Sequence, residues 1–132
     1  MLAMMRLALT AISLAAVSGH VLAQSKRWAA IDPNAEASSP VVWGASREKA
    51  QDEAVGACRR VSKSCAEAPA STDDPDDVFA VMCCTRPARA CAASPAGDRD
   101  GARAAVEATL RGSGFSRCTL KRYISARTGH GL

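Results

Sequence analysis

The sequence contains very little histidine and lacks the short cysteine motifs that bind metals or haem. Of the two histidines in 132 residues, His20 lies in a segment expected to be cleaved off, and His130 lies two residues from the C-terminus. Chain ends are usually mobile, and a mobile imidazole is a poor general base. No C-x-x-C or C-x-x-C-H pattern occurs, which disfavours zinc and haem. We therefore expect no catalytic residue, no metal site and no cofactor.

Aromatic residues are also scarce, at 4% of the chain. Surfaces that bind single-stranded nucleic acid interleave aromatic and basic side chains, and the net charge of +4 is modest, so nucleic acid is a disfavoured partner. Because a small domain needs large apolar side chains inside, we expect Trp28 and Trp43 to belong to the core rather than to a partner-binding surface.

No apolar run is long enough to cross a membrane. The run from Leu7 to Val17 would span roughly 17 Å as a helix, whereas a bilayer core is about 30 Å thick. Arg6 before the run and a small residue after it are typical of a secretory signal peptide over residues 1–23. Gln24 follows the cleavage point, where a lipid anchor would require cysteine. We expect a periplasmic or secreted mature domain, residues 24–132, that is not an integral membrane protein.

Cysteine is plentiful by comparison, and all six cysteines lie in the mature part of the chain. An even number in a small exported domain predicts three disulfides, each contributing about 2 to 4 kcal/mol. Such bridges would support a core in which alanine supplies much of the apolar content. The six are Cys58, Cys65, Cys83, Cys84, Cys91 and Cys118.

The adjacent pair restricts how these cysteines combine. Neighbouring side chains of a strand point to opposite faces, so Cys83 and Cys84 need different partners and cannot both be in the core. We favour Cys58 with Cys65, which would join the end of a helix to a following strand. The two remaining cysteines then pair with Cys83 and Cys84 in either order.

Two segments of the chain resemble two later segments at one offset of 51 residues. Trp28-Ala29-Ala30-Ile31 falls on Phe79-Ala80-Val81-Met82, and Ala54-Val55 falls on Ala105-Val106. A shared offset over a strand-like and a helix-like segment predicts an internal duplication. The halves would be residues 27–65 and 78–124. An exposed linker, residues 66–77, rich in Ala, Pro, Ser and Asp, would join them.

The first half contains three expected strands and one helix. Residues 27–32, 40–44 and 61–65 are the expected strands, and Asp32-Pro33-Asn34 is a turn sequence after the first. Ser46 is the expected N-cap of the helix. The apolar stripe of this helix comprises Ala50, Ala54, Ala57, Cys58 and Val61.

The second half repeats this order, with strands over residues 78–84, 89–93 and 115–124. Asp98 or Asp100 would cap its helix, which two glycines end. One face of that helix carries Ala102, Ala105, Val106, Thr109 and Leu110. The order β-β-α-β, twice, predicts a disulfide-stapled α+β two-layer sandwich: one antiparallel or mixed sheet with two helices on one face.

These segments together resemble a known family. The strand at residues 28–31, its echo at 79–82 and the helix motif Ser-Arg-Glu-x-Ala-x-x-x-Ala-x-x-x-Cys over residues 46–58 look like the domain-of-unknown-function 4189 family. The resemblance implies a small exported bacterial protein with duplicated strand and helix units and few cysteines. It implies no shared activity.

Two charged segments are candidate binding surfaces. The first is an acidic stretch, where Pro75 stands in place of the glycine that calcium loops place at their bend, so a solvated loop is favoured over a calcium site. Its members are Asp73, Asp74, Asp76 and Asp77. The second is a basic C-terminal strand, which would either guard a sheet edge against aggregation or bind an anionic surface. Its members are Arg117, Lys121, Arg122 and Arg127.

Alternation along this last strand predicts two faces. One would carry Cys118, Leu120, Arg122 and Ile124, and the other Arg117, Thr119, Lys121 and Tyr123.

The sequence favours an exported, non-enzymatic binding protein of the bacterial envelope that contacts an unidentified protein partner. An inhibitor or immunity protein against an envelope-acting toxin or lytic enzyme is one concrete version. Two alternatives stay open: a secreted effector acting on host or competitor cells, and a small secreted enzyme whose site is built from Asp or Ser residues that are distant in sequence.

Overall fold

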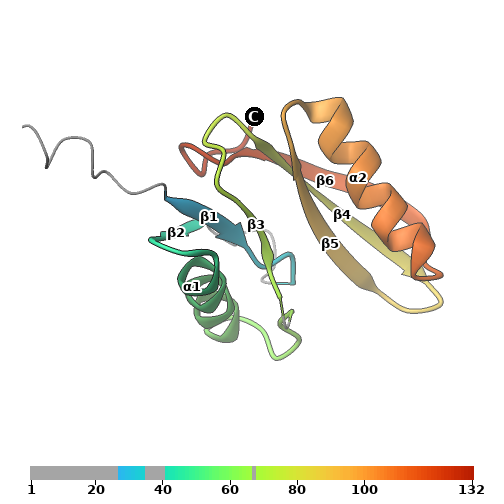
Figure 1. Ribbon diagram of the computed structural model, residues 1–132. Coiled ribbons are helices and arrows are strands. Elements are labelled where there is room, and N and C mark those ends of the chain that lie inside the picture. Colours follow the sequence, from blue (N-terminus) through green and yellow to red (C-terminus); the bar gives the residue numbers. More distant parts are fainter. Residues whose placement is uncertain (1–26, 35–40, 67) are drawn as a thin grey trace, which may run out of the picture.

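The computed structural model describes residues 27–34, 41–66 and 68–132 (Figure 1). The predicted signal peptide lies outside these residues. The described elements, in chain order, are β1 (Trp28–Ile31), β2 (Val42–Gly44), α1 (Arg47–Arg59), β3 (Ala70–Thr72), β4 (Val78–Arg86), β5 (Ala90–Ala96), α2 (Arg99–Gly112) and β6 (Ser116–Ser125). The predicted α+β class is confirmed.

The strands form two three-stranded antiparallel sheets, so the prediction of one sheet is wrong. The short sheet has the order β2-β1-β3, and the long sheet has the order β5-β4-β6. The central strand of each sheet is the first strand of the corresponding half of the chain, β1 in the short sheet and β4 in the long sheet. The strands of the short sheet have three or four residues, whereas β4 has nine and β6 has ten.

Each sheet packs against a helix on its outer face and against the other sheet on its inner face. In β1, Ala30 packs against Ala50 and Ala54 of α1. Its neighbours Ala29 and Ile31 point the other way and pack against the long sheet. The short sheet therefore lies between α1 and the long sheet.

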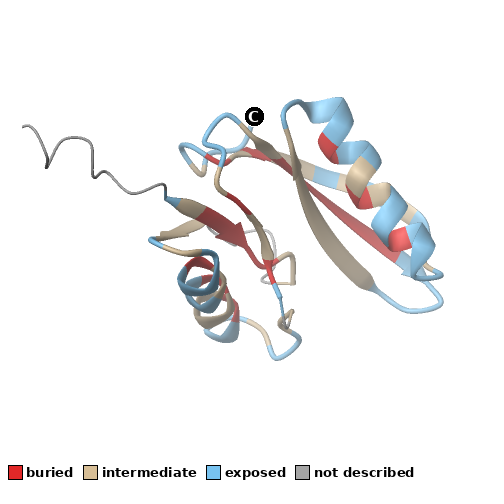
Figure 2. Ribbon diagram, in the orientation of Figure 1, coloured by how far each residue is buried: buried red, intermediate tan, exposed pale blue. Residues whose placement is uncertain are grey.

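The long sheet repeats this arrangement with α2 on its outer side. Ala80, Met82 and Cys84 of β4 pack under Ala102, Val106 and Leu110 of α2, whereas Phe79 and Val81 face the short sheet. The layers thus run α1, short sheet, long sheet, α2 (Figure 1). The expectation of both helices on one face is wrong, because a sheet with two apolar faces needs a cover on each. Figure 2 shows β4 as a buried strand through the middle.

The offset of 51 residues superposes positions that face opposite ways. At that offset Trp28, which packs toward α1, falls on Phe79, which faces the other sheet. The N-caps of the two helices, Ser46 and Asp98, are 52 residues apart. A change of one residue reverses every side chain of a strand. At an offset of 51 residues, the matched strand positions Trp28 and Phe79 therefore face opposite sides.

Both predicted helix starts are confirmed. The Ser46 hydroxyl accepts a hydrogen bond from Lys49 N at 3.2 Å, and the Asp98 carboxylate accepts one from Gly101 N at 2.7 Å. These bonds satisfy backbone donors that the first helical turn leaves without partners. The buried positions of α1 are Ala50, Ala54 and Cys58, and those of α2 are Ala102, Val106 and Leu110.

The third strand of the first half lies elsewhere than predicted. Residues 61–65 form no strand, and Val61 is 56% exposed. Instead β3 forms at residues 70–72, within the stretch predicted as a linker, and pairs with β1. Because β3 has three residues and contains no run of large apolar side chains, its sequence resembles a loop.

A β-bulge interrupts the last strand. In the pairing with β4, Arg122 lies opposite Val81 and Leu120 lies opposite Met82, which leaves Lys121 as the extra residue. Leu120 and Cys118 therefore face α2, whereas Ile124 faces the short sheet. The predicted alternation placed these on one face and is wrong across the bulge, because the extra residue shifts the period by one.

The three predicted disulfides form. Cys58 bonds to Cys65 as expected, and the open choice resolves as Cys83 with Cys91 and Cys84 with Cys118. Cys83 and Cys84 do point to opposite faces. However, both are buried, contrary to expectation: Cys84 lies beneath α2, and Cys83 lies on the inner face of β4, which the short sheet covers in part. Disulfides of this number indicate an oxidising environment, periplasmic or extracellular.

Gly44 lies where β2 meets the start of α1, and this contact gives a prediction. A Cβ at this position would lie 2.6 Å from the backbone nitrogen of Ala50. Because neither backbone can yield without moving α1, we expect Gly44→Ala to destabilise the fold by about 1 to 3 kcal/mol. The same substitution at Gly56, in α1 with no atom within 4 Å of the added Cβ, should stabilise by about 0.5 to 1 kcal/mol. Urea denaturation of both variants measures the free energy of unfolding, which should fall for Gly44→Ala and rise for Gly56→Ala.

Candidate functional site

The long sheet extends beyond the short one, and a cleft lies where its inner face loses its cover. The cleft has a volume of about 510 Å³. One wall is the long sheet, and the other is formed by the turn after β1 and the segment after α1. The lining residues are Pro33, Asn34, Ser62, Ser64, Val81, Cys83, Arg89, Ala90, Cys91, Lys121 and Arg122.

The cleft is strongly basic. Three of its lining residues, Arg89, Lys121 and Arg122, carry positive charge, and none of the described residues that line it is acidic. Two of the three come from the bulge of β6. A regular strand would send consecutive side chains to opposite faces, whereas here both Lys121 and Arg122 line the cleft.

Burial affects Arg122 in particular. Its side chain is half-buried, and desolvation lowers the pKa of its guanidinium below the ordinary value. Arginine still keeps its proton in proteins, because its ordinary pKa is very high. Arg122 therefore keeps its positive charge at the wall of the cleft.

The opposite wall carries neutral polar groups, Asn34, Ser62 and Ser64. Asp32 anchors the two segments that form this wall, the turn after β1 and the segment after α1. Its carboxylate oxygens accept hydrogen bonds from Asn34 N at 3.0 Å and from Ala66 N at 2.9 Å. The buried aspartate that follows β1 thereby holds the turn and the segment after α1 beside the long sheet.

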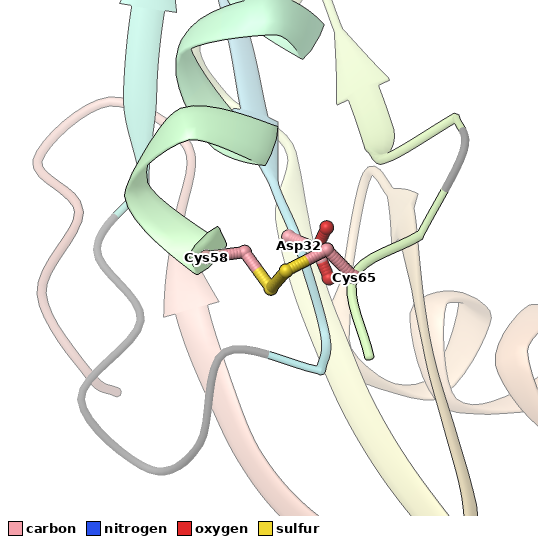
Figure 3. A group of neighbouring side chains, drawn as sticks. All are labelled: Asp32, Cys58 and Cys65. Carbon is pink, nitrogen blue, oxygen red and sulfur yellow. A yellow bond between two sulfur atoms is a disulfide. The ribbon is translucent and has the colours of Figure 1, made fainter. Parts of the chain in front are cut away.

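Asp32 also lies next to the disulfide of Cys58 and Cys65 (Figure 3). The carboxylate and the two sulfurs lie within 4.8 Å of one another. The sulfurs are bonded to each other, so neither offers the thiolate that a metal ion requires. This group is a structural junction that fixes the cleft wall.

The predicted acidic surface is a folded turn between β3 and β4. Asp77 accepts a hydrogen bond from Thr72 Oγ1 at 2.5 Å, and Asp74 accepts one from Asp76 N at 2.9 Å. Asp76 also pairs with Arg127 at 2.6 Å. The carboxylates of Asp74, Asp76 and Asp77 thus have partners within the turn or at the C-terminus, and Asp73 lies in the same turn.

The four residues of the predicted basic edge lie in three places. Lys121 and Arg122 line the cleft, whereas Arg127 pairs with Asp76 on the acidic turn. The two candidate surfaces therefore meet each other at one point. Arg117 is exposed and adopts a positive φ of 53° at the far end of β6.

The C-terminal residues are hydrogen-bonded to β6, and the tryptophans lie at the edge of the core. Backbone hydrogen bonds from Ser125 N to His130 O and from Leu132 N to Tyr123 O, at 2.9 and 3.0 Å, fold the last residues back on β6. Both tryptophans are half-buried against the core, and Trp43 Nε1 donates to Ala126 O at 2.9 Å.

Several residues of the cleft gave no signal in the sequence. The sequence placed Arg89 in the expected strand over residues 89–93 and Asn34 in a turn. It placed Ser62 and Ser64 in the expected strand over residues 61–65. They meet because the sheets stack face to face, a long-range arrangement that no local pattern encodes. The cations of β6 were the one available signal, through the absence of acidic residues after Glu107.

Comparison with protein-family models, with curated proteins and with solved structures finds no match to this chain. Among the described residues, no helix has the length and apolar character needed to span a membrane.

Proposed function

We propose that the chain is an exported, non-enzymatic binding protein that receives an acidic segment of a partner protein in its basic cleft. One concrete version is an inhibitor or immunity protein against an envelope-acting toxin or lytic enzyme. The observation that carries the proposal is the cleft itself, with three cations on one wall and no acid among its described lining residues.

The chemistry of the lining favours a peptide. Guanidinium and ammonium groups bind carboxylates through charge-assisted hydrogen bonds, and the exposed Arg89 can bind one in a bidentate manner. Asn34, Ser62 and Ser64 on the facing wall offer donors and acceptors that suit a peptide backbone. No described aromatic side chain lines the cleft, so the stacking platform for nucleobases is missing there.

The scaffold supports this role. Three disulfides and two helix-covered sheets hold both walls in place, and a preformed site loses little entropy on binding. The duplication of a ββαβ unit is also part of the proposal. It is supported by the common strand order, in which the first strand of each half lies between the other two.

Binding of a fluorescent hexaglutamate peptide tests the proposal. We expect measurable affinity for the mature protein at low salt and none for hexaglutamine. Arg89→Gln together with Lys121→Gln should weaken the binding about tenfold, since each exposed ion pair is worth up to about 1 kcal/mol. Both side chains are exposed, so the substitutions remove charge without opening the core.

The matched control removes the same charge from elsewhere. Lys49→Gln together with Arg103→Gln acts on exposed positions of the two outer helices and should change the dissociation constant less than about twofold. Equal weakening by both pairs would mean that net charge alone attracts the peptide, and the cleft would not be the site. The same variants then serve as bait for capture from envelope and culture fractions.

A further inference from the structure

The three disulfides lie in three different electrostatic surroundings. Cys83 and Cys91 both line the basic cleft, and Cys91 is the more exposed of the two. Their bridge lies on the wall that also carries Arg89 and Lys121, with Arg89 two residues before Cys91. This bridge is therefore open to solvent through a cavity lined by positive charge.

The other two bridges lack such surroundings. Cys58 and Cys65 lie beside the Asp32 carboxylate, which repels an approaching anion. Cys84 is fully buried in the apolar layer beneath α2, and its partner Cys118 packs against the same layer. The chain thus contains one disulfide beside cations, one beside a carboxylate and one in an apolar layer, and their reactivity can be compared within a single molecule.

These surroundings matter because the species that opens a disulfide is the thiolate anion. Nearby cations raise the local concentration of an anionic thiol and stabilise the leaving thiolate, and a leaving group of lower pKa departs faster. We infer that Cys83–Cys91 is a thiol–disulfide exchange site for small thiols that carry a carboxylate. This inference uses the cleft but does not depend on the proposed protein partner.

The reaction balances without any other reagent. One carboxylate-bearing thiolate attacks Cys91 Sγ, on the more exposed residue of the pair, forms a mixed disulfide there and releases Cys83 as thiolate. A second thiolate attacks the sulfur of the small molecule in that mixed disulfide and releases Cys91 as thiolate. Two small thiols are thereby oxidised to their disulfide, and the protein bridge gains two electrons and then takes up protons from water.

Two small thiols of opposite charge test the inference. The folded mature protein is treated with mercaptopropionate or with cysteamine at low ionic strength, quenched with acid, alkylated and mapped by mass spectrometry. Each rate constant is divided by the thiolate fraction at the working pH and by the rate constant of the same thiolate with a small uncharged disulfide, which removes the difference in intrinsic nucleophilicity. The opening rate of each bridge is then compared between the anionic and the cationic thiol, with circular dichroism verifying that the fold persists.

We expect Cys83–Cys91 to open first with mercaptopropionate and to favour it over cysteamine about tenfold, whereas Cys58–Cys65 should favour cysteamine. Arg89→Gln with Lys121→Gln should reduce the tenfold preference to about threefold. Lys49→Gln with Arg103→Gln should leave it unchanged. If another bridge opens first, or if both double variants lower the preference equally, the inference is wrong.

This outcome is separable from that of the proposed function. Hexaglutamate binding without a selective opening of Cys83–Cys91 would contradict only the exchange site. Selective opening without peptide binding would contradict only the protein-binding proposal and keep the exchange site.

Discussion

Replacement of Phe79 by alanine is expected to destabilise the fold by about 4 kcal/mol. Phe79 is fully buried in the layer between the sheets, where it packs with Ile31, Val41 and Ile124. Removal of a buried phenylalanine side chain typically costs about 3 to 5 kcal/mol, through lost transfer energy and the cavity left behind. Urea denaturation followed by circular dichroism measures this change in the free energy of unfolding.

The loss of stability should be this large because no disulfide links the two sheets across the layer in which Phe79 packs. Each disulfide joins two residues of the same half. The contact between the sheets therefore relies on apolar packing and a few hydrogen bonds, including Trp43 Nε1 to Ala126 O.

Phe115→Ala is the matched control for this prediction, since Phe115 is only half-buried and lies in the layer beneath α2. It should cost clearly less than Phe79→Ala. Equal losses, or a loss below about 1 kcal/mol for Phe79→Ala, would contradict the central place given to the layer between the sheets.

Local signals predicted most elements of this fold well. Ser46 and Asp98, the latter one of two expected candidates, cap the helices, and small or apolar residues at helical spacing form the buried stripes. These features depend on residues three to eight positions apart, so the sequence contains them directly. The expectation that Cys83 and Cys84 have different partners followed from a similarly local fact, that adjacent residues of a strand face opposite ways, whereas the sequence left open which of them pairs with Cys91.

The arrangement of the layers was not predictable in this way. Ala29 and Ala30 are the same residue type, yet one faces the long sheet and the other faces α1. Alanine on both faces gives no alternation from which a two-sided cover could be inferred. β3 is three residues long and lies within the stretch predicted as a linker, because its pairing with β1 depends on distant residues.

The cleft was only partly predictable for the same reason. Lys121 and Arg122 were identified as basic candidates, but alternation placed them on opposite faces. The bulge brings both to the cleft, and a bulge depends on the register with β4 rather than on β6 alone. Asn34 and Ser62 join them through the anchoring of Asp32, which the sequence showed only as a turn residue.

Removal of the Cys84–Cys118 bridge is expected to cost about 4 kcal/mol, whereas removal of Cys58–Cys65 should cost about 2 kcal/mol. The first bridge joins residues 34 positions apart and the second joins residues 7 apart. In the chain-entropy description, a longer closed loop restricts the unfolded chain more strongly. Double alanine variants are appropriate, because Cys84 is fully buried and serine would place a hydroxyl in an apolar layer.

Thermal unfolding should separate the two double variants clearly. For a domain of this size 1 kcal/mol corresponds to roughly 4 to 8 °C, so the Cys84→Ala/Cys118→Ala midpoint should lie on the order of 10 °C below that of Cys58→Ala/Cys65→Ala. The longer loop, which the Cys84–Cys118 bridge closes, contains β5 and α2 and runs from the central strand β4 to the edge strand β6. If the two variants unfold at the same temperature, loop length does not govern these bridges, and their stabilisation comes from contacts in the folded state.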